Sequence, residues 1–507
     1  MTKEYLVIGS GPAGVSAAQA LLDRDVFVTL LDVGVELEPS RQDLLEQLQL
    51  HWDEKNYEPL KHNINNQDAI KLSYGSDYLY QKISQHFSIV TDENTHCTPS
   101  FARGGLSNVW GAYTALYNDD DMHAWPIKID TLAPYYQKIM TILPVNEHYQ
   151  RSQQANHLLK NINKNFFSLE SAGFSIQPTR LSVYFNGKKT KSGCFYCGNC
   201  QHGCPNNLIY SANDTLEQLL QHPKFSYVKN MVVKKIEEQE DIMLVFAHAL
   251  SDSSKKITFR GDRVFLAAGA IFSTGILLNS LGLFDHPILL KHSQHFMLPC
   301  LMNKSVSNVE MEKLHTLTQL SLRIKNTNIA LHPIHLQIYT YMDHYTMQLR
   351  SVLKKIFPIA KPLLKPIINR LLIIQGYFHS DDSLNCEIRL SRDTKTLSLK
   401  KSDNIIDSRK KIAALNRYLM KYRKQLGLTP IGFMTKFSKL LRSNHYGGSF
   451  PMQAGEHTLT TTDLLGRPYG MQKLHVVDAT VFPTIPAQAI TITIMANAYR
   501  IASECPL

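Results

Sequence analysis

Four of the eight cysteines form one short run, Cys194, Cys197, Cys200 and Cys204, with a proline directly after the last one. The spacing C-x2-C-x2-C-x3-C-P is that of bacterial ferredoxins, in which thiolates hold an iron–sulfur cluster. No second run follows, so a single cluster would need Cys204 to bend back or a remote thiol to join. Disulfides are disfavoured in a cytoplasmic protein, and zinc usually takes two separated cysteine pairs. The run predicts either an iron–sulfur cluster or a set of structural free thiols.

A second stretch, Gly9-Ser10-Gly11-Pro12-Ala13-Gly14, stands between the apolar residues 5–8 and 15–22. The first apolar segment predicts a buried parallel strand and the second a helix, so the glycines fall where the chain must turn. Gly9 permits the tight turn, Gly11 lets the backbone approach a pyrophosphate, and Gly14 lets the helix pack against the strand. The helix N-terminus faces the phosphates, and Asp32 accepts a ribose hydroxyl. These residues predict a dinucleotide-binding unit.

A third stretch, residues 102–111, reads Ala-Arg-Gly-Gly-Leu-Ser-Asn-Val-Trp-Gly. Two glycines followed by small polar residues suit a loop that lies against a flat ring system. A Cβ would collide with the ring, and backbone N–H groups can reach its heteroatoms. An ordinary turn is the alternative.

Together with Trp125-Pro126 and residues 132–136, this loop resembles the glucose–methanol–choline (GMC) family of FAD oxidoreductases. Residues 264–270 resemble the family's middle strand, and residues 476–500 resemble its closing strand, flavin-contacting turn and last helix. The resemblance implies an α/β fold, with a Rossmann-type FAD-binding domain and an inserted α+β substrate domain that contains an antiparallel sheet.

The resemblance covers both ends and the middle of the chain and is faint between residues 301 and 430. We therefore expect residues 1–120, 225–300 and 435–507 to form the FAD-binding domain. Residues 121–224, with the cysteine run, and 301–434 would form the substrate domain. FAD is expected to bind without a covalent link, because Arg103 stands where some relatives place a linking histidine, and a link through the nearby His96 is the alternative. The motifs and the resemblance together predict these FAD-binding residues: Gly9, Gly11, Pro12, Ala13, Gly14, Asp32, Arg103, Gly104, Gly105, Ser107, Asn108, Trp110, Gly111, Val233, Ala268, Gly269, Asp478, Ala479, Ala489, Ile490 and Thr491.

Residues 443–450, Ser-Asn-His-Tyr-Gly-Gly-Ser-Phe, resemble the family's histidine motif, which places an imidazole beside the flavin. An alcohol is too weak an acid to ionise first, so a positioned base must take the hydroxyl proton as the hydride leaves. Neutral histidine suits this task, and His445 is the predicted base. The position where relatives carry a second His or Asn falls on Ala489. Gln488, one residue earlier, is the predicted replacement if the turn is shifted.

The formal net charge of +11 permits anionic partners, but the sequence contains no recognisable nucleic-acid module. No apolar run is long enough to span a membrane, for which about 18 residues are needed. The first predicted strand begins too close to the N-terminus to leave room for a secretion signal. These features predict a cytoplasmic protein.

Residues 347–374 combine apolar positions at helical spacing with basic residues on the other side, and no acidic residue occurs between positions 344 and 380. Pro358, Pro362 and Pro366 each remove a backbone donor, which favours two short helices over a single one. We expect this stretch to contact the anionic inner face of a membrane peripherally. A core-facing helix pair is the alternative.

The resulting prediction is a GMC-type FAD-dependent alcohol dehydrogenase or oxidase. It would take a hydride from a CH–OH group of a sugar, lipid-linked or long-chain alcohol. The cysteine run is similar to loops in the family's sugar dehydrogenases, which carry an iron–sulfur cluster, and in its long-chain alcohol oxidases. A cluster would favour an electron-acceptor protein over oxygen. An FAD-containing lyase or decarboxylase and a flavin/thiol redox sensor are the alternatives.

Overall fold

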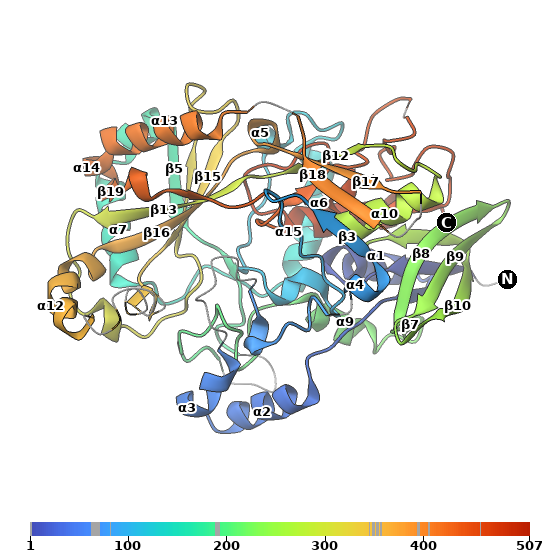
Figure 1. Ribbon diagram of the computed structural model, residues 1–507, viewed down its shortest axis with the longest axis horizontal. Helices are drawn as coiled ribbons and strands as arrows, with labels where there is room; N and C mark the ends of the chain where they lie inside the picture. Colours follow the sequence, from blue (N-terminus) through green and yellow to red (C-terminus); the bar gives the residue numbers. More distant parts are fainter. Residues whose placement is uncertain are drawn as a thin grey trace.

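The computed structural model, drawn in Figure 1, describes residues 3–61, 71–81, 83–187, 193–343, 345–346, 350, 354, 357–392, 396–403, 406–456 and 458–507. Within residues 357–361 it describes the backbone alone.

A five-stranded parallel sheet collects strands from the two ends and the middle of the chain. Its order is β22 (Leu474–Val476), β11 (Arg263–Leu266), β1 (Glu4–Ile8), β2 (Phe27–Leu31) and β7 (Phe225–Val228). Strands β1 and β11 are buried along almost their whole length, as parallel strands covered on both faces should be. Helices α1 (Pro12–Leu22) and α15 (Thr491–Glu504) pack against each other beside the sheet. Residues from both ends of the chain thus share one core.

A three-stranded antiparallel sheet lies at the right of Figure 1, made of β8 (Met231–Gln239), β9 (Ile242–Ala249) and β10 (Asp252–Gly261). Helix α10 (Ala270–Ser280) packs against β8.

The left half of Figure 1 contains a seven-stranded antiparallel sheet with its own hydrophobic core. Its order is β19 (Leu428–Pro430), β13 (His295–Met302), β16 (Leu371–Tyr377), β15 (Ile334–Tyr339), β14 (Leu320–Ile324) and β5 (Phe174–Pro178), and β20 (Lys436–Phe437) pairs with β13. Helices α7 (Gln153–Lys164), α8 (Phe166–Ser171), α13 (Ser408–Lys421) and α14 (Arg423–Leu426) contribute residues to this core.

A further five-stranded sheet joins the two halves, because β12 leads directly into β13. It consists of β21 (Tyr446–Gly447), β12 (Ile288–His292), β17 (Cys386–Leu390), β18 (Thr396–Lys401) and β3 (Ser88–Thr91). The remaining elements include β4 (Val145–Asn146) and β6 (Leu181–Ser182), which pair, and α2 (Pro39–Leu50), α3 (Glu54–Tyr57), α4 (Ile83–His86), α5 (Asp119–Met122), α6 (Ile129–Ile142), α9 (Ala212–Leu219) and α12 (Phe357–Ile368).

The predicted fold class is confirmed: a parallel α/β part is combined with an α+β part that holds an antiparallel sheet. The division of the chain at residues 120, 224, 300 and 434 stays a prediction. None of the described helices is long and apolar enough to cross a membrane.

The helical pattern predicted over residues 347–374 is wrong at its C-terminal end. Helix α12 ends at Ile368, and β16 begins at Leu371 and pairs with both β13 and β15. Pairing on both sides overrides the local 3.6-residue spacing, because a central strand satisfies every backbone group of these apolar residues. Residues 347–349, 351–353, 355 and 356 of this stretch lie outside the described residues.

Candidate active site

The turn between β1 and α1 has the geometry that its glycines predict. Gly9 has a φ of +99°, and a Cβ added there would lie 2.5 Å from the Ala267 carbonyl oxygen. A Cβ on Gly14 would lie 1.8 Å from the Gly9 carbonyl oxygen, so the helix could not approach the turn. A Cβ on Gly11 would meet no protein atom within 4 Å, because Gly11 faces an open cavity. This difference fits a phosphate approaching at Gly11 alone.

Asp32 ends β2 at the edge of the same cavity. Its Oδ2 accepts hydrogen bonds from Ser10 Oγ at 2.5 Å and from the Tyr227 hydroxyl at 3.0 Å. Burial raises the pKa of Asp32 to about 6, although both hydroxyl donors oppose this shift. The carboxylate is therefore held as an acceptor where a dinucleotide's ribose is expected.

The loop after Ala102 is fixed by its own polar side chains. Ser107 Oγ donates to the Gly104 carbonyl at 2.6 Å and accepts from the Ala212 N–H at 2.8 Å. Asn108 Nδ2 donates to the Arg103 carbonyl at 2.8 Å, and the Arg103 guanidinium pairs with Glu217 at 2.7 Å. The polar side chains of Arg103, Ser107 and Asn108 are thus bonded within the protein, and these bonds fix the conformation of the loop.

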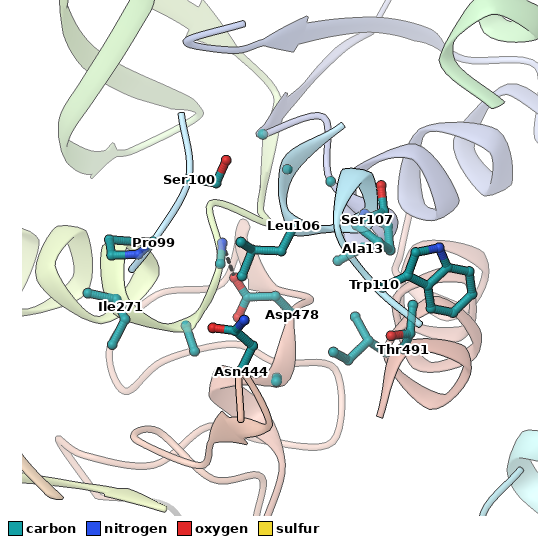
Figure 2. A pocket seen from close by; sticks show the side chains of 18 of the residues that line it. Ala13, Pro99, Ser100, Leu106, Ser107, Trp110, Ile271, Asn444, Asp478 and Thr491 are labelled. Atoms are coloured by element: carbon teal, nitrogen blue, oxygen red, sulfur yellow. Dashed lines mark hydrogen bonds between the residues drawn. The ribbon is translucent and has the colours of Figure 1, made fainter. Parts of the chain in front are cut away.

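A cavity of about 460 Å³ extends from the glycine turn to the antiparallel sheet. Figure 2 shows that Ala13, Leu106, Ile271 and Asp478 surround one space, although they come from four separate parts of the chain. The cavity brings together these predicted residues: Gly9, Gly11, Pro12, Ala13, Asp32, Gly105, Ser107, Trp110, Gly111, Val233, Ala268, Gly269, His445, Asp478, Ala479, Ala489, Ile490 and Thr491. The predicted residues that do not line it are Gly14, Arg103, Gly104, Asn108 and Gln488.

Asp478 connects two walls of the cavity (Figure 2). Its Oδ2 accepts from the Gly269 N–H at 2.9 Å and from Ser273 Oγ at 2.5 Å, at the N-terminus of α10. Its Oδ1 accepts from the Thr480 N–H at 2.9 Å. Burial raises the pKa of Asp478, while these donors favour the charged form. Its carboxylate oxygens are thus already bonded within the protein, and its observed contacts are structural.

His445 lies in the cavity wall just before β21. Its backbone carbonyl accepts from the Ser293 N–H at 2.9 Å, and its ring stacks on Tyr377 with centroids 4.9 Å apart and planes 23° apart. Nδ1 is buried and has no hydrogen-bond partner among the described residues. Burial lowers the pKa of His445 to about 4, so the imidazole is neutral at physiological pH. A neutral ring fixed in this way can accept a proton.

Ala489, the position predicted for the partner residue, has no polar side chain. Ala489 lines the cavity and packs against Tyr113 and Ala115. The Oε1 atom of Gln488 is buried without a hydrogen-bond partner among the described residues. The role of Gln488 stays a prediction.

Sequence reasoning missed a polar wall formed by Gln337, Tyr339, Gln375 and Tyr377. Gln337 lies directly opposite Gln375 in the β15–β16 pair, so alternate residues of both strands face the cavity. The Tyr339 hydroxyl is 3.3 Å from Gln337 Oε1, and the Tyr377 hydroxyl is 3.4 Å from Gln375 Oε1. The signal was the alternation of polar and apolar residues in β15, which the sequence analysis did not predict, whereas β16 begins with four consecutive apolar residues and gives no such signal.

The four cysteines of the run are free and partly buried. Burial, with a smaller contribution from the neighbouring thiols, raises the pKa of Cys194 and Cys197 to about 12 and that of Cys204 to about 11. No three of these four described thiols have sulfurs within 4.8 Å of one another. Gln201, from the same loop, lines the cavity. The iron–sulfur cluster stays a prediction.

Among the described residues, one group of three could offer ligands to a metal ion: His332, His379 and Asp381. His332 Nδ1 lies 2.9 Å from Asp382 Oδ2, and Lys291 Nζ pairs with Asp381 at 3.2 Å. His379 Nδ1 accepts the Asp381 N–H at 3.1 Å, which places the ring proton on Nε2. His379 Nε2 therefore carries a proton and has no lone pair to offer a metal ion.

Two comparisons with known proteins bear on the family and the fold of the chain. Residues 399–498 match the family model of GMC oxidoreductases. Among the solved structures, pyridoxine 4-oxidase from Mesorbium loti matches with a TM-score of 0.60 and 15% sequence identity, over 99% of this chain and 98% of that chain. No curated protein matches the sequence significantly.

The predicted resemblance is confirmed, in the C-terminal part by sequence and over the whole chain by fold. The sequence match supports a GMC oxidoreductase in the C-terminal part of the chain, and together with the fold it supports an FAD-dependent enzyme that acts on alcohols. FAD is the cofactor of this family, and the open approach at Gly11 and the acceptor Asp32 fit it.

Proposed function

We propose that the protein oxidises the CH–OH group of a small polar alcohol, such as a sugar, with FAD in the cavity and His445 as the base. One observation carries the proposal: the neutral ring of His445 and the pyrophosphate turn at Gly9 and Gly11 line one continuous cavity. The polar wall on β15 and β16 supports a substrate with several hydroxyl groups over a long-chain alcohol.

FAD, when bound, accepts the hydride of the alcohol. His445 takes the hydroxyl proton on a ring nitrogen, and its stack on Tyr377 keeps the ring from turning away. Tyr339 and Gln375 can hydrogen-bond the remaining hydroxyl groups and orient the CH–OH carbon. Gln488 is the proposed second polar group, provided that its buried amide turns toward the cavity.

The test is anaerobic reduction of bound FAD by a panel of polyols and aromatic alcohols, followed as bleaching of the flavin absorption. The variant His445→Ala should hold FAD and lose about 10² to 10⁴ in the rate constant of reduction, the contribution of a positioned base. Gln488→Ala should also slow reduction. The control is Gln201→Ala, a cavity residue far from the histidine in sequence, which should change apparent affinity but not the limiting rate. Wild-type rates in His445→Ala would remove the assigned base.

The same panel separates the competing functions. A lyase or decarboxylase would consume its substrate without lasting bleaching of the flavin. A redox sensor would show no alcohol-dependent bleaching at all.

We also propose that the cysteine run provides an exit for electrons to an acceptor protein. The run reaches the cavity through Gln201, and Cys200 lies close enough to Lys71 to affect its pKa. An iron–sulfur cluster on Cys194, Cys197, Cys200 and Cys204 would supply single-electron transfer. Iron and sulfide analysis after anaerobic reconstitution tests this, with Cys300→Ser as a control outside the run. Protein without iron would leave these residues as structural thiols.

A further inference from the structure

Lys71 is the one cation among the described residues that line the cavity. The other charged lining residues are Asp32 and Asp478, and both accept hydrogen bonds from protein donors. Lys71 keeps some accessible surface because it faces the cavity, while the protein around it desolvates the ammonium group and lowers its pKa to about 8.

The ammonium group of Lys71 is only partly satisfied by the described residues. Nζ donates to the Val109 carbonyl at 3.0 Å and to the Trp110 carbonyl at 3.5 Å. An ammonium has three N–H bonds, so one donor remains. No described carboxylate pairs with it, and Cys200 is the one group that opposes the loss of its charge. A cation removed from water without a counter-ion is costly, so buried charges are normally paired.

Lys71 lies at the end of the cavity where the substrate is expected. A Cβ on Gly111, next to the two carbonyls that Lys71 contacts, would lie 3.8 Å from the Tyr339 hydroxyl. The other end of the loop of residues 102–111 lies at the glycine turn expected to bind the pyrophosphate, where a Cβ on Gly105 would lie 3.5 Å from Gly11 Cα. The Lys71 ammonium group thus lies at the end of the cavity that carries the polar wall, and not at the end where the phosphates are expected.

We infer that Lys71 binds an anionic group, a carboxylate or a phosphate, carried by the alcohol substrate, and that Gln201 and Tyr339 supply the neighbouring polar contacts. That the anionic group is carried by the substrate rests on the proposed function, whereas the binding of an anion by Lys71 does not depend on turnover. The enzyme would then act on a hydroxy acid or a phosphorylated alcohol and discriminate against the neutral analogue.

The experiment measures binding to the FAD-loaded enzyme through perturbation of the flavin spectrum. Benzoate and phenyl phosphate are the anionic probes, and benzamide is the neutral probe of similar shape. Wild type should bind an anion at least about tenfold more tightly than benzamide, and Lys71→Met should remove that preference. Whichever of the two anions binds more tightly identifies the anionic group. Lys71→Gln removes the charge but keeps a donor for the two carbonyls, and it replaces Lys71→Met if that variant does not fold.

Asp68 provides the matched control, because it is near Lys71 in sequence and lies outside the described residues. Asp68→Asn should leave the preference for the anion unchanged if the ligand is the counter-ion of Lys71. The inference is overturned by anions that bind no more tightly than benzamide, or by an anion preference that survives in Lys71→Gln. A lowered flavin reduction potential in Lys71→Gln with unchanged benzoate affinity also overturns it, because the cation would then serve the flavin.

Turnover separates this inference from the proposed function. Wild type should be reduced faster by 4-(hydroxymethyl)benzoate than by benzyl alcohol at low concentration, with the advantage lost in Lys71→Gln. Lysine-dependent benzoate binding without reduction by any alcohol would refute the proposed function and retain the anion site. Reduction by benzyl alcohol with no preference for 4-(hydroxymethyl)benzoate would refute the anion site and retain the proposed function.

Discussion

The pH dependence of flavin reduction should report the buried state of His445. The proposed base acts in its neutral form, so its activity is present above its pKa and is lost as the pH falls through it. Burial lowers the pKa of His445 to about 4. A solvated imidazole, with a pKa of about 6.5, would be only about one tenth neutral at pH 5.5.

The two cases therefore differ by roughly tenfold at pH 5.5. With a pKa of about 4, the limiting rate constant should be nearly the same at pH 5.5 and at pH 8. With an ordinary pKa, it should fall about tenfold over this interval. The assay is anaerobic stopped-flow reduction with a saturating alcohol, together with the same alcohol deuterated at the reacting carbon.

A persistent isotope effect at both pH values shows that the chemical step is being observed. Circular dichroism at pH 5.5 controls for loss of structure. A rate constant that falls with a midpoint near 6.5, with the isotope effect intact, would refute the assignment of a desolvated His445 as the base.

Three further predictions concern the cofactor turn, the fold and the surface. Gly11→Ala should weaken FAD binding with a change in stability within about 0.5 kcal/mol, whereas Gly14→Ala should lower the melting temperature, because only at Gly14 would the new Cβ meet protein atoms. Equal melting temperatures would contradict this reading of the turn. The free energy of unfolding should decrease as the pH falls from about 6.5 toward 4. His292 is fully buried with a pKa lowered to about 4, so the unfolded state binds a proton that the folded state refuses, at about 1.4 kcal/mol per pH unit. His292→Leu should make the urea midpoint less dependent on pH, and an unchanged dependence would refute this. Helix α12 exposes 80% of Leu363 and 47% of Ile367, so the protein should float with anionic liposomes at low salt. Leu363→Asp should abolish flotation, and a protein that stays in solution at low salt would return this helix to an ordinary surface.

Much of the cofactor side could be predicted from sequence because its signals are local. Gly9, Gly11 and Gly14 lie within one turn, and their roles follow from where a Cβ would collide. Asp32 follows from the length of one helix and one strand. His445, which the family's histidine motif predicted, lines the cavity, and its role as the base stays a prediction.

The substrate side could be decided only by tertiary structure. Tyr377 reaches the cavity because β16 pairs between β13 and β15, although the preceding residues predicted that a helix would continue through Leu371. Lys71 faces the cavity because its ammonium reaches carbonyls of the loop that ends at Gly111, a contact that no periodicity encodes. Arg103 and Asn108, by contrast, belong to the predicted motif but bond within the protein. The sequence by itself determined the glycine turn and the acid after the second strand, because these residues lie in one short stretch of chain. Only the assembled sheets decided which polar side chains of β15 and β16 line the cavity, because these strands come from separate parts of the chain and pair in the sheet.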